Sequence, residues 1–250
     1  MNDKSKYNVD VLAIGAHPDD VELTAGGTVA KLTKEGKTVA MVDFTQGELG
    51  TRGNENIRRT EAAKAAEILG VKFRENLFMP DGYVKVTDDN ILKVINILRK
   101  YRPKAVLINP PFERHPDHEA SHNILRTAMF KSGLRKIQTE FEGQPQEPWR
   151  IRKMYAYMQS YQFTRHPDFY IDISETFETK MNAIKAYVSQ VYVEGMSDPG
   201  GPVTRLSRPE FLRELEARAI YFGTQVGYRY AEAFYSVEPV GISSLSALFD

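Results

Sequence analysis

The chain of 250 residues contains no cysteine, and its charges cancel, with 33 basic and 33 acidic side chains. Without cysteine it can form neither a disulfide framework nor a thiolate metal site, so nitrogen and oxygen atoms must hold any bound metal. Because the charge is balanced, the composition gives no general reason to expect nucleic acid or an anionic membrane as a partner. A metal site in this chain must therefore consist of His, Asp or Glu side chains.

Long apolar runs are absent as well. The apolar stretch from Val9 to Ala16, which follows a polar N-terminus, is far shorter than the roughly 20 residues that a membrane span needs. Hydrophobic residues make up 42% of the chain and charged residues 26%, as in ordinary globular domains rather than disordered or fibrous ones. We therefore expect a cytoplasmic protein with one domain that spans residues 1–250.

Short apolar segments alternate with segments of helical periodicity along the chain. The sequence predicts strands at residues 9–14, 38–44, 74–78, 105–108, 153–158 and 169–173. It predicts helices at residues 21–35, 56–69, 88–100, 117–132, 176–187 and 209–222. This alternation is typical of βαβ units, so we expect an α/β, Rossmann-like three-layer fold with a mostly parallel central sheet. In that architecture the active site lies at the C-terminal edge of the strands.

Two long segments stand outside this pattern. Residues 132–150 are rich in Gly, Pro, Gln and charge, which indicates a surface loop. Residues 193–208 include the run GMSDPGGP and are too long for a simple connection, which favours a wall or lid of the active site. The tail from Val237 onward is expected either to dock on the domain or to fray.

A His-Pro-Asp-Asp sequence directly follows the first predicted strand, at the edge of the sheet where a site is expected. A histidine and a carboxylate three residues apart on a turn can reach one metal ion, which makes His17 and Asp20 candidate ligands. The carboxylate between them, Asp19, points elsewhere and remains free for proton transfer. In a hydrolase, Asp19 would act as general base and accept a proton from a water that the metal has acidified.

A second motif, His-Pro-Asp-His at residues 115–118, lies in the loop after the fourth predicted strand. Two motifs at strand ends can converge, so His118 would complete a set of two histidines and one carboxylate with open positions for water and substrate. His115 is expected to stabilise the oxyanion and to protonate the departing amine, with Asp117 orienting its ring and keeping it protonated. His122 is expected to support the site or to pack in the core.

Other interpretations of these motifs stay open. A single His-Pro-Asp sequence is often only a turn, because Pro fixes φ and Asp caps the next helix, and residues 166–168 are interpreted that way. Two histidines and one carboxylate suit zinc, but they also suit ferrous iron, which leaves a non-haem iron oxygenase as an alternative. A non-catalytic sugar-binding module is a third alternative, although residues 15–19 lack the Gly-x-Gly-x-x-Gly pattern of nucleotide sites.

The two motifs resemble those of the PIG-L/LmbE-like deacetylases, which carry Ala-His-Pro-Asp-Asp after the first strand and His-Pro-Asp-His much later. Here these motifs occupy residues 16–20 and 115–118. Further similarities lie at residues 45–48, 58–70 and 230–234. The resemblance implies a zinc-dependent hydrolase that removes the acetyl group from an N-acetylglucosamine conjugate, a small-molecule substrate.

The resemblance also implies roles for individual residues. Zinc would bind to His17, Asp20 and His118, Asp19 would be the general base, and His115 would stabilise the transition state. An arginine at the position of Arg58 lies in the substrate site of the family. Arg114, directly before the second motif, is similar to an arginine that contacts the acidic part of the substrate.

Within the family, the length of the chain and its Phe-Glu-Arg-His-Pro-Asp-His context are similar to the bacillithiol biosynthesis branch. That branch deacetylates N-acetyl-glucosaminyl L-malate, whose carboxylates would pair with Arg114 and Arg58. Chitin oligosaccharides, the mycothiol precursor and lipid-linked N-acetylglucosamine are the alternative substrates. The loops at 132–150 and 193–208 are expected to set this specificity. Family members are often oligomeric, so the resemblance is compatible with a homo-oligomer.

Overall fold

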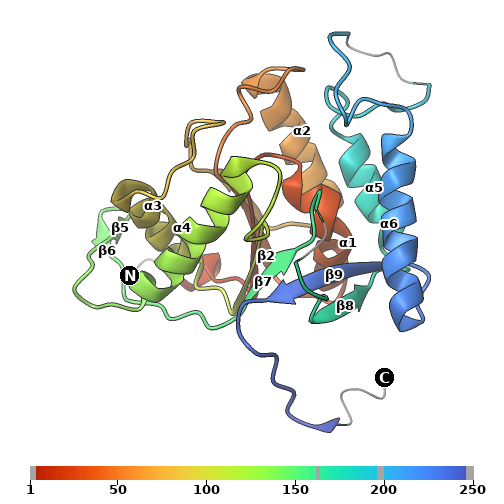
Figure 1. Cartoon of the computed structure of the whole chain (residues 1–250). Helices are drawn as coiled ribbons and strands as arrows, with labels where there is room; N and C mark the ends of the chain where they lie inside the picture. The colour runs from red at the N-terminus through yellow and green to blue at the C-terminus, as the bar shows by residue number, and fades with distance from the viewer. Residues whose placement is uncertain (1–3, 162–163, 196–199, 246–250) are drawn as a thin grey trace.

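The structure, a computed structural model, describes residues 4–161, 164–195 and 200–245. Within these residues seven strands form one sheet in the order β3-β2-β1-β4-β7-β9-β8 (Figure 1). The strands are β1 (Val11–Gly15), β2 (Val39–Asp43), β3 (Phe73–Asn76), β4 (Ala105–Ile108), β7 (Met154–Tyr157), β8 (Phe169–Asp172) and β9 (Ala231–Ser236). The first five strands in this order, β3, β2, β1, β4 and β7, are parallel to one another, whereas β9 is antiparallel to both β7 and β8. The mostly parallel α/β sheet is therefore confirmed.

Helices cover both faces of this sheet. Leu12 and Ile14 of β1 belong to a core shared with α3 (Asp88–Tyr101) and α4 (Pro116–Ser132). Ala13 points to the other face, where the core includes side chains of α1 (Asp20–Lys34), α2 (Glu55–Ile68) and α5 (Phe177–Lys185). The last helix, α6 (Phe211–Val226), contacts β8 and β9. Alternation of side chains along buried parallel strands thus produces the predicted three layers.

The predicted element bounds differ from the observed ones by at most two residues, apart from the end of α6, which lies four residues later. Strand β9 was not predicted. Its sequence, Ala-Glu-Ala-Phe-Tyr-Ser, contains two alanines and the buried Glu232, which hide the apolar pattern of a strand. The carboxylate of Glu232 accepts hydrogen bonds from Gly27, Thr28 and Lys180, so it ties β9 to α1 and α5.

The C-terminal tail is exposed. Val237 is half-buried and donates its N–H to Met154, but residues 238–245 are exposed and extend away from the sheet (Figure 1). The described part of the tail frays rather than docks. In the part of the chain that the structure describes, no helix has the length and apolar character that crossing a bilayer requires.

Replacing Asp10, which lies just before β1, with asparagine is expected to lower stability at neutral pH more than at acidic pH. Hydrogen bonds from Lys104 and Thr38 lower the pKa of Asp10 from 3.8 to about 2. Because this value is below that of the unfolded chain, the stabilisation is complete above about pH 4 and is lost as the pH falls toward 2. Its size is about 1 kcal/mol, since water screens the exposed Lys104.

Urea unfolding of the parent and Asp10→Asn proteins at about pH 6 and about pH 3 measures this difference. Glu175→Gln, which breaks the more exposed pair with Lys34, is the matched control and should change the free energy of unfolding less. An Asp10→Asn deficit that is equal at both pH values would contradict the assignment.

Candidate active site

A cavity of about 430 Å³ opens at the C-terminal edge of the parallel strands, as the fold predicts. Much of its lining comes from the segments that follow all five parallel strands. His17 follows β1, Gly50 follows β2, Asp81 follows β3, His115 follows β4, and Gln159 follows β7. Residues far apart in the sequence are therefore brought together by the ends of parallel strands.

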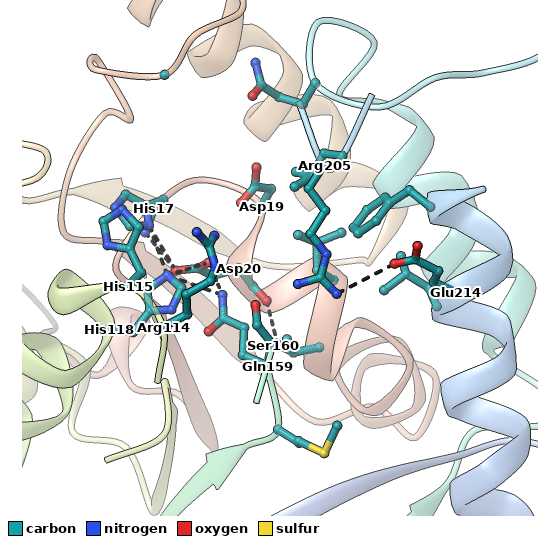
Figure 2. Close-up of a pocket in the computed structure, with 18 of the residues that line it drawn as sticks. His17, Asp19, Asp20, Arg114, His115, His118, Gln159, Ser160, Arg205 and Glu214 are labelled. Atoms are coloured by element: carbon teal, nitrogen blue, oxygen red, sulfur yellow. Dashed lines mark hydrogen bonds and ion pairs between the residues drawn. The ribbon is translucent and has the colours of Figure 1, made fainter. Parts of the chain in front are cut away.

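The structure brings His17, Asp20 and His118 to one point, on one side of the cavity (Figure 2). His118 Nε2 lies 3.3 Å from His17 Nδ1 and 3.3 Å from Asp20 Oδ1. His17 Nδ1 lies 3.6 Å from Asp20 Oδ2. Donor atoms about 2.0–2.1 Å from one tetrahedral ion are about 3.3–3.4 Å from each other, so these spacings fit a single metal ion.

The chemistry of the donor set also fits a divalent cation. Three nitrogen and oxygen donors that leave the cavity side open are typical of catalytic rather than structural sites. Burial alone would raise the pKa of Asp20, but His118 and His17 outweigh it and hold that pKa well below its usual value. Asp20 is therefore ionised and ready to bind a cation.

Two amide side chains that were not predicted from the sequence donate hydrogen bonds to Asp20. Asn109 Nδ2 donates to Asp20 Oδ2 at 3.0 Å, and Gln159 Nε2 donates to Asp20 Oδ1. The two amides also bond to each other, at 2.8 Å. In addition, the carbonyl of Gln159 accepts a hydrogen bond from Arg218 of α6, and the carbonyl of Asn109 lies 3.0 Å from His122 Nδ1. His122 is buried and supports the site through Asn109 rather than lining the cavity.

The other ring nitrogen of His17 contacts two more carboxylates. His17 Nε2 lies 3.0 Å from Asp81 Oδ1 and 3.3 Å from Asp117 Oδ2. Burial alone would lower the pKa of His17, but hydrogen bonds, first that of Asp117, outweigh it and hold the pKa well above its usual value. Both carboxylates thus fix the orientation of the His17 ring and leave Nδ1 directed at Asp20 and His118.

His115 lies beside the candidate ligands, but not in the state that its sequence context suggested. A nitrogen of its ring lies within 4.8 Å of nitrogen atoms of His17 and His118. Its Nδ1 accepts the backbone N–H of Asp117 at 3.2 Å, whereas the Asp117 carboxylate binds Gly82 and His17. Burial and the neighbouring histidines lower the pKa of His115. The backbone, not the carboxylate, orients this ring, and the lowered pKa favours its neutral form at neutral pH.

Asp19 is buried in the wall of the cavity, at the start of α1. Its backbone has a φ of 110°, a left-handed conformation that is costly for a residue other than glycine and is often found at functional sites. Burial raises the pKa of Asp19 to about 7, despite the opposing charge of Arg58. A carboxylate with a pKa near neutrality suits a general base.

Arg58 lines the cavity, but its guanidinium is already engaged. Nη2 donates to Asp19 Oδ2 at 2.9 Å and to the carbonyl of Pro18, and Nη1 donates to the carbonyl of Gly47 at 3.2 Å. Only 5% of the residue is exposed. In this structure Arg58 positions the candidate base, so it is not free to pair with a substrate carboxylate as the family resemblance implied.

The outer part of the cavity carries further arginines. Arg114 lines it and is exposed, and within the described residues its guanidinium has no acidic partner. Arg205 lies on another side of the cavity, 3.6 Å from Glu214 (Figure 2). Because Arg205 belongs to the segment at 193–208, the described part of that segment forms a wall of the cavity, as expected.

The segment at 132–150 lies at the surface, as expected, but it does not meet the expectation that it sets substrate specificity. It contains the two-stranded ladder of β5 (Glu140–Phe141) and β6 (Gln144–Pro145) and packs on α3, where Asn96 donates to the carbonyl of Glu140 at 2.9 Å. No residue of this fully described segment lines the cavity. It lies at the C-terminal ends of α3 and α4, which are at the opposite edge of the sheet, so it does not set specificity directly.

Comparison with known proteins places this site in a family. The model of the PIG-L family, described as GlcNAc-PI de-N-acetylase, matches residues 12–129. A diacetylchitobiose deacetylase from Thermococcus kodakarensis is 32% identical over 232 residues, which are 89% of this chain and 80% of that protein. The chain belongs to the PIG-L family.

Two other similar proteins extend the comparison. The crystal structure of the conserved protein TT1542 from Thermus thermophilus has a TM-score of 0.82 and 33% identity, with 95% of this chain and 98% of that chain covered. A probable N-acetyl-alpha-D-glucosaminyl L-malate deacetylase 2 from Bacillus cereus is 27% identical over 72% of this chain and 83% of its own length. The resemblance drawn from the two His-Pro-Asp motifs is confirmed, as is the expectation of a hydrolytic deacetylase.

Replacing Gln159 with alanine in this PIG-L chain is expected to weaken metal binding by about 10- to 100-fold, the usual effect of removing a group that orients a ligand. The substitution removes the amide that donates to Asp20 and bonds to Asn109. Competition with a chromophoric chelator measures the dissociation constant. Gln138→Ala, at an exposed position, is the matched control. Equal metal affinity in both variants would show that Gln159 does not orient Asp20.

Proposed function

We propose that this protein hydrolyses the N-acetyl group of an N-acetylglucosamine conjugate with a divalent metal, zinc in the first instance, held by His17, Asp20 and His118. The observation that carries the proposal is the cavity that contains both this donor set and a separate carboxylate, Asp19, whose pKa of about 7 suits a base. The separate base favours hydrolysis over a site that only binds sugar and over an iron oxygenase, whose facial triad alone is enough to hold its metal.

The chain's own residues supply the proton transfers of this reaction. When bound, the metal acidifies a water and polarises the amide carbonyl. Asp19 accepts the proton of the attacking water as the oxygen bonds to the carbonyl carbon. The carbon–nitrogen bond then breaks, and the leaving amine takes up the proton that Asp19 carried. The acetic acid formed then loses its proton, the second proton of the water, to the amine, so the products are acetate and the protonated amine, and atoms and charge balance.

His115 stabilises the oxyanion as a neutral ring. Because Nδ1 accepts the backbone N–H of Asp117, the proton of the neutral ring resides on Nε2, which can donate a hydrogen bond. Such a donor acts on charge that develops in the transition state, where preorganised hydrogen bonds contribute most. This assignment keeps the predicted oxyanion role of His115, changes its protonation state and transfers the predicted protonation of the amine from His115 to Asp19.

For the rest of the conjugate, we favour a neutral second sugar over malate. The malate interpretation called for Arg58 and Arg114 together, but Arg58 is buried against Asp19. The relative from Thermococcus kodakarensis is named a diacetylchitobiose deacetylase and covers more of this chain than the relative from Bacillus cereus. The malate conjugate remains the second candidate, because Arg114 has no acidic partner in the described part of the chain.

The test is amine release by the zinc-loaded protein from N-acetylglucosamine, N,N′-diacetylchitobiose and N-acetyl-glucosaminyl L-malate. We expect the highest kcat/KM for diacetylchitobiose. A higher value for the malate conjugate would select the second candidate, and no release from any of these sugars would contradict the proposed function.

A further inference from the structure

Two exposed aromatic rings lie side by side near the mouth of the cavity. Phe112 is 56% exposed and Tyr161 is 44% exposed, and their ring centroids are 5.9 Å apart with the planes tilted by 36°. Phe112 belongs to the loop after β4 and Tyr161 to the segment after β7, so two neighbouring strands present the pair at the catalytic edge of the sheet. Single exposed apolar side chains are common on protein surfaces, but exposed apolar side chains that cluster beside a cavity often mark a ligand-binding surface.

A buried carboxylate holds the backbone beneath this pair. Glu113 is 5% exposed, and its Oε2 accepts the N–H groups of Ser160 at 2.6 Å and Tyr161 at 3.2 Å. Its Oε1 accepts the N–H of Arg114. No ion pair to Glu113 occurs within the described residues. The carboxylate therefore fixes two loops to each other, which positions the exposed rings rather than leaving them free.

The pair is next in sequence to residues that line the catalytic cavity. Arg114 and Ser160, which are labelled in Figure 2, line the cavity and are near neighbours in sequence of Phe112 and Tyr161. Arg114 adds an exposed guanidinium without an acidic partner in the described part of the chain. The rim thus combines an apolar aromatic surface with a strong hydrogen-bond donor.

We infer that Phe112 and Tyr161 form a stacking platform for the sugar ring next to the one that is deacetylated. This inference rests on the proposed function and specifies its substrate as an N-acetylglucosamine oligosaccharide. A pyranose ring has apolar C–H faces that pack on aromatic rings and hydroxyl groups that accept hydrogen bonds from a guanidinium. The cavity holds the reacting sugar, and the second ring lies over the pair with its hydroxyl groups toward Arg114.

The test compares substrates that differ only in the second ring. For the double variant Phe112→Ala, Tyr161→Ala, the ratio of kcat/KM for N,N′-diacetylchitobiose to kcat/KM for N-acetylglucosamine is expected to fall by about tenfold, through KM. Each single variant is expected to show a smaller decrease in this kcat/KM ratio. Phe130→Ala is the matched control, because Phe130 is 66% exposed near the C-terminal end of α4, at the opposite edge of the sheet from the cavity.

A binding measurement separates this inference from the proposed function. In an Asp19→Asn background, calorimetry with N,N′-diacetylchitobiose should show weaker binding for the double variant than for the parent, whether or not the sugar is a substrate. An unchanged kcat/KM ratio together with unchanged binding would overturn the platform. A change of oligomeric state in the double variant, measured by light scattering, would also overturn the platform, because the rings of the parent protein would then pack against a second copy of the chain.

Discussion

Replacing Asp19 with asparagine is expected to lower kcat for amine release by about 10²- to 10⁴-fold, the usual contribution of a positioned acid–base group. Asparagine has the same shape, tolerates the φ of 110° at this position and can still accept the hydrogen bond from Arg58. It cannot accept a proton. The loss of rate should therefore occur with an unchanged metal content per chain.

Glu214→Gln provides the matched control for this variant. Glu214 also lines the cavity, but it pairs with Arg208 and Arg205 at the rim and has no part in proton transfer. Its loss is expected to change kcat little, since exposed ion pairs contribute little. An Asp19→Asn protein that keeps more than about a tenth of the parental kcat would show that another group removes the proton.

The pH dependence of kcat/KM should follow the ionisation of Asp19. Burial raises the pKa of Asp19 to about 7, and the base must be deprotonated to act. Activity is therefore expected to rise with pH on the acidic side, with a midpoint at or below about pH 7, because a bound cation would favour the charged carboxylate. The pH profile of the Asp19→Asn variant should lack this rise on the acidic side.

Replacing a metal ligand is expected to lower activity about as much as Asp19→Asn does, but through loss of the metal rather than loss of the base. Asp20→Ala deletes one of the three donors and leaves His17 and His118 to hold the ion alone. Because the loss of a supporting residue alone typically costs 10- to 100-fold in affinity, the loss of a ligand should cost more than about 100-fold. Activity should fall with the metal content, and excess metal should restore only part of it.

Asp81→Asn is the informative comparison for this prediction. Asp81 contacts the nitrogen of His17 that faces away from Asp20, so its loss should weaken metal binding only by about 10- to 100-fold. The dissociation constants of the two variants, measured by chelator competition, should therefore rank in that order. The opposite order would mean that the ion binds on the Asp81 side of His17.

Much of the fold could be predicted from the sequence because parallel strands are buried on both faces and read as continuous apolar runs. The runs at β1 and β4 are of this kind, and the glycines and polar residues after them mark the strand ends. Strand β9 could not be predicted, because its buried Glu232 accepts hydrogen bonds from Gly27, Thr28 and Lys180, which are distant in the sequence. Such tertiary partners leave no local pattern.

The two motifs at residues 16–20 and 115–118 predicted six site residues, and the structure places all six in or beside one cavity. Their partners were harder to predict. Asn109 and Gln159 follow β4 and β7, and a polar amide at a strand end was a signal that could have been used. Asp81 gave no such signal, because it lies in the loop five residues after β3. The engagement of Arg58 by Asp19 likewise depends on a turn geometry that the sequence does not encode locally.

The most direct test of the central claim is a metal titration of the metal-free protein, followed as amine release from N,N′-diacetylchitobiose. We predict that activity is absent without metal and rises to a plateau at about one zinc ion per chain, with acetate and free amine formed in equal amounts. Full activity in the metal-free protein, or a plateau reached equally by the Asp20→Ala variant, would contradict a reaction that depends on the site of His17, Asp20 and His118.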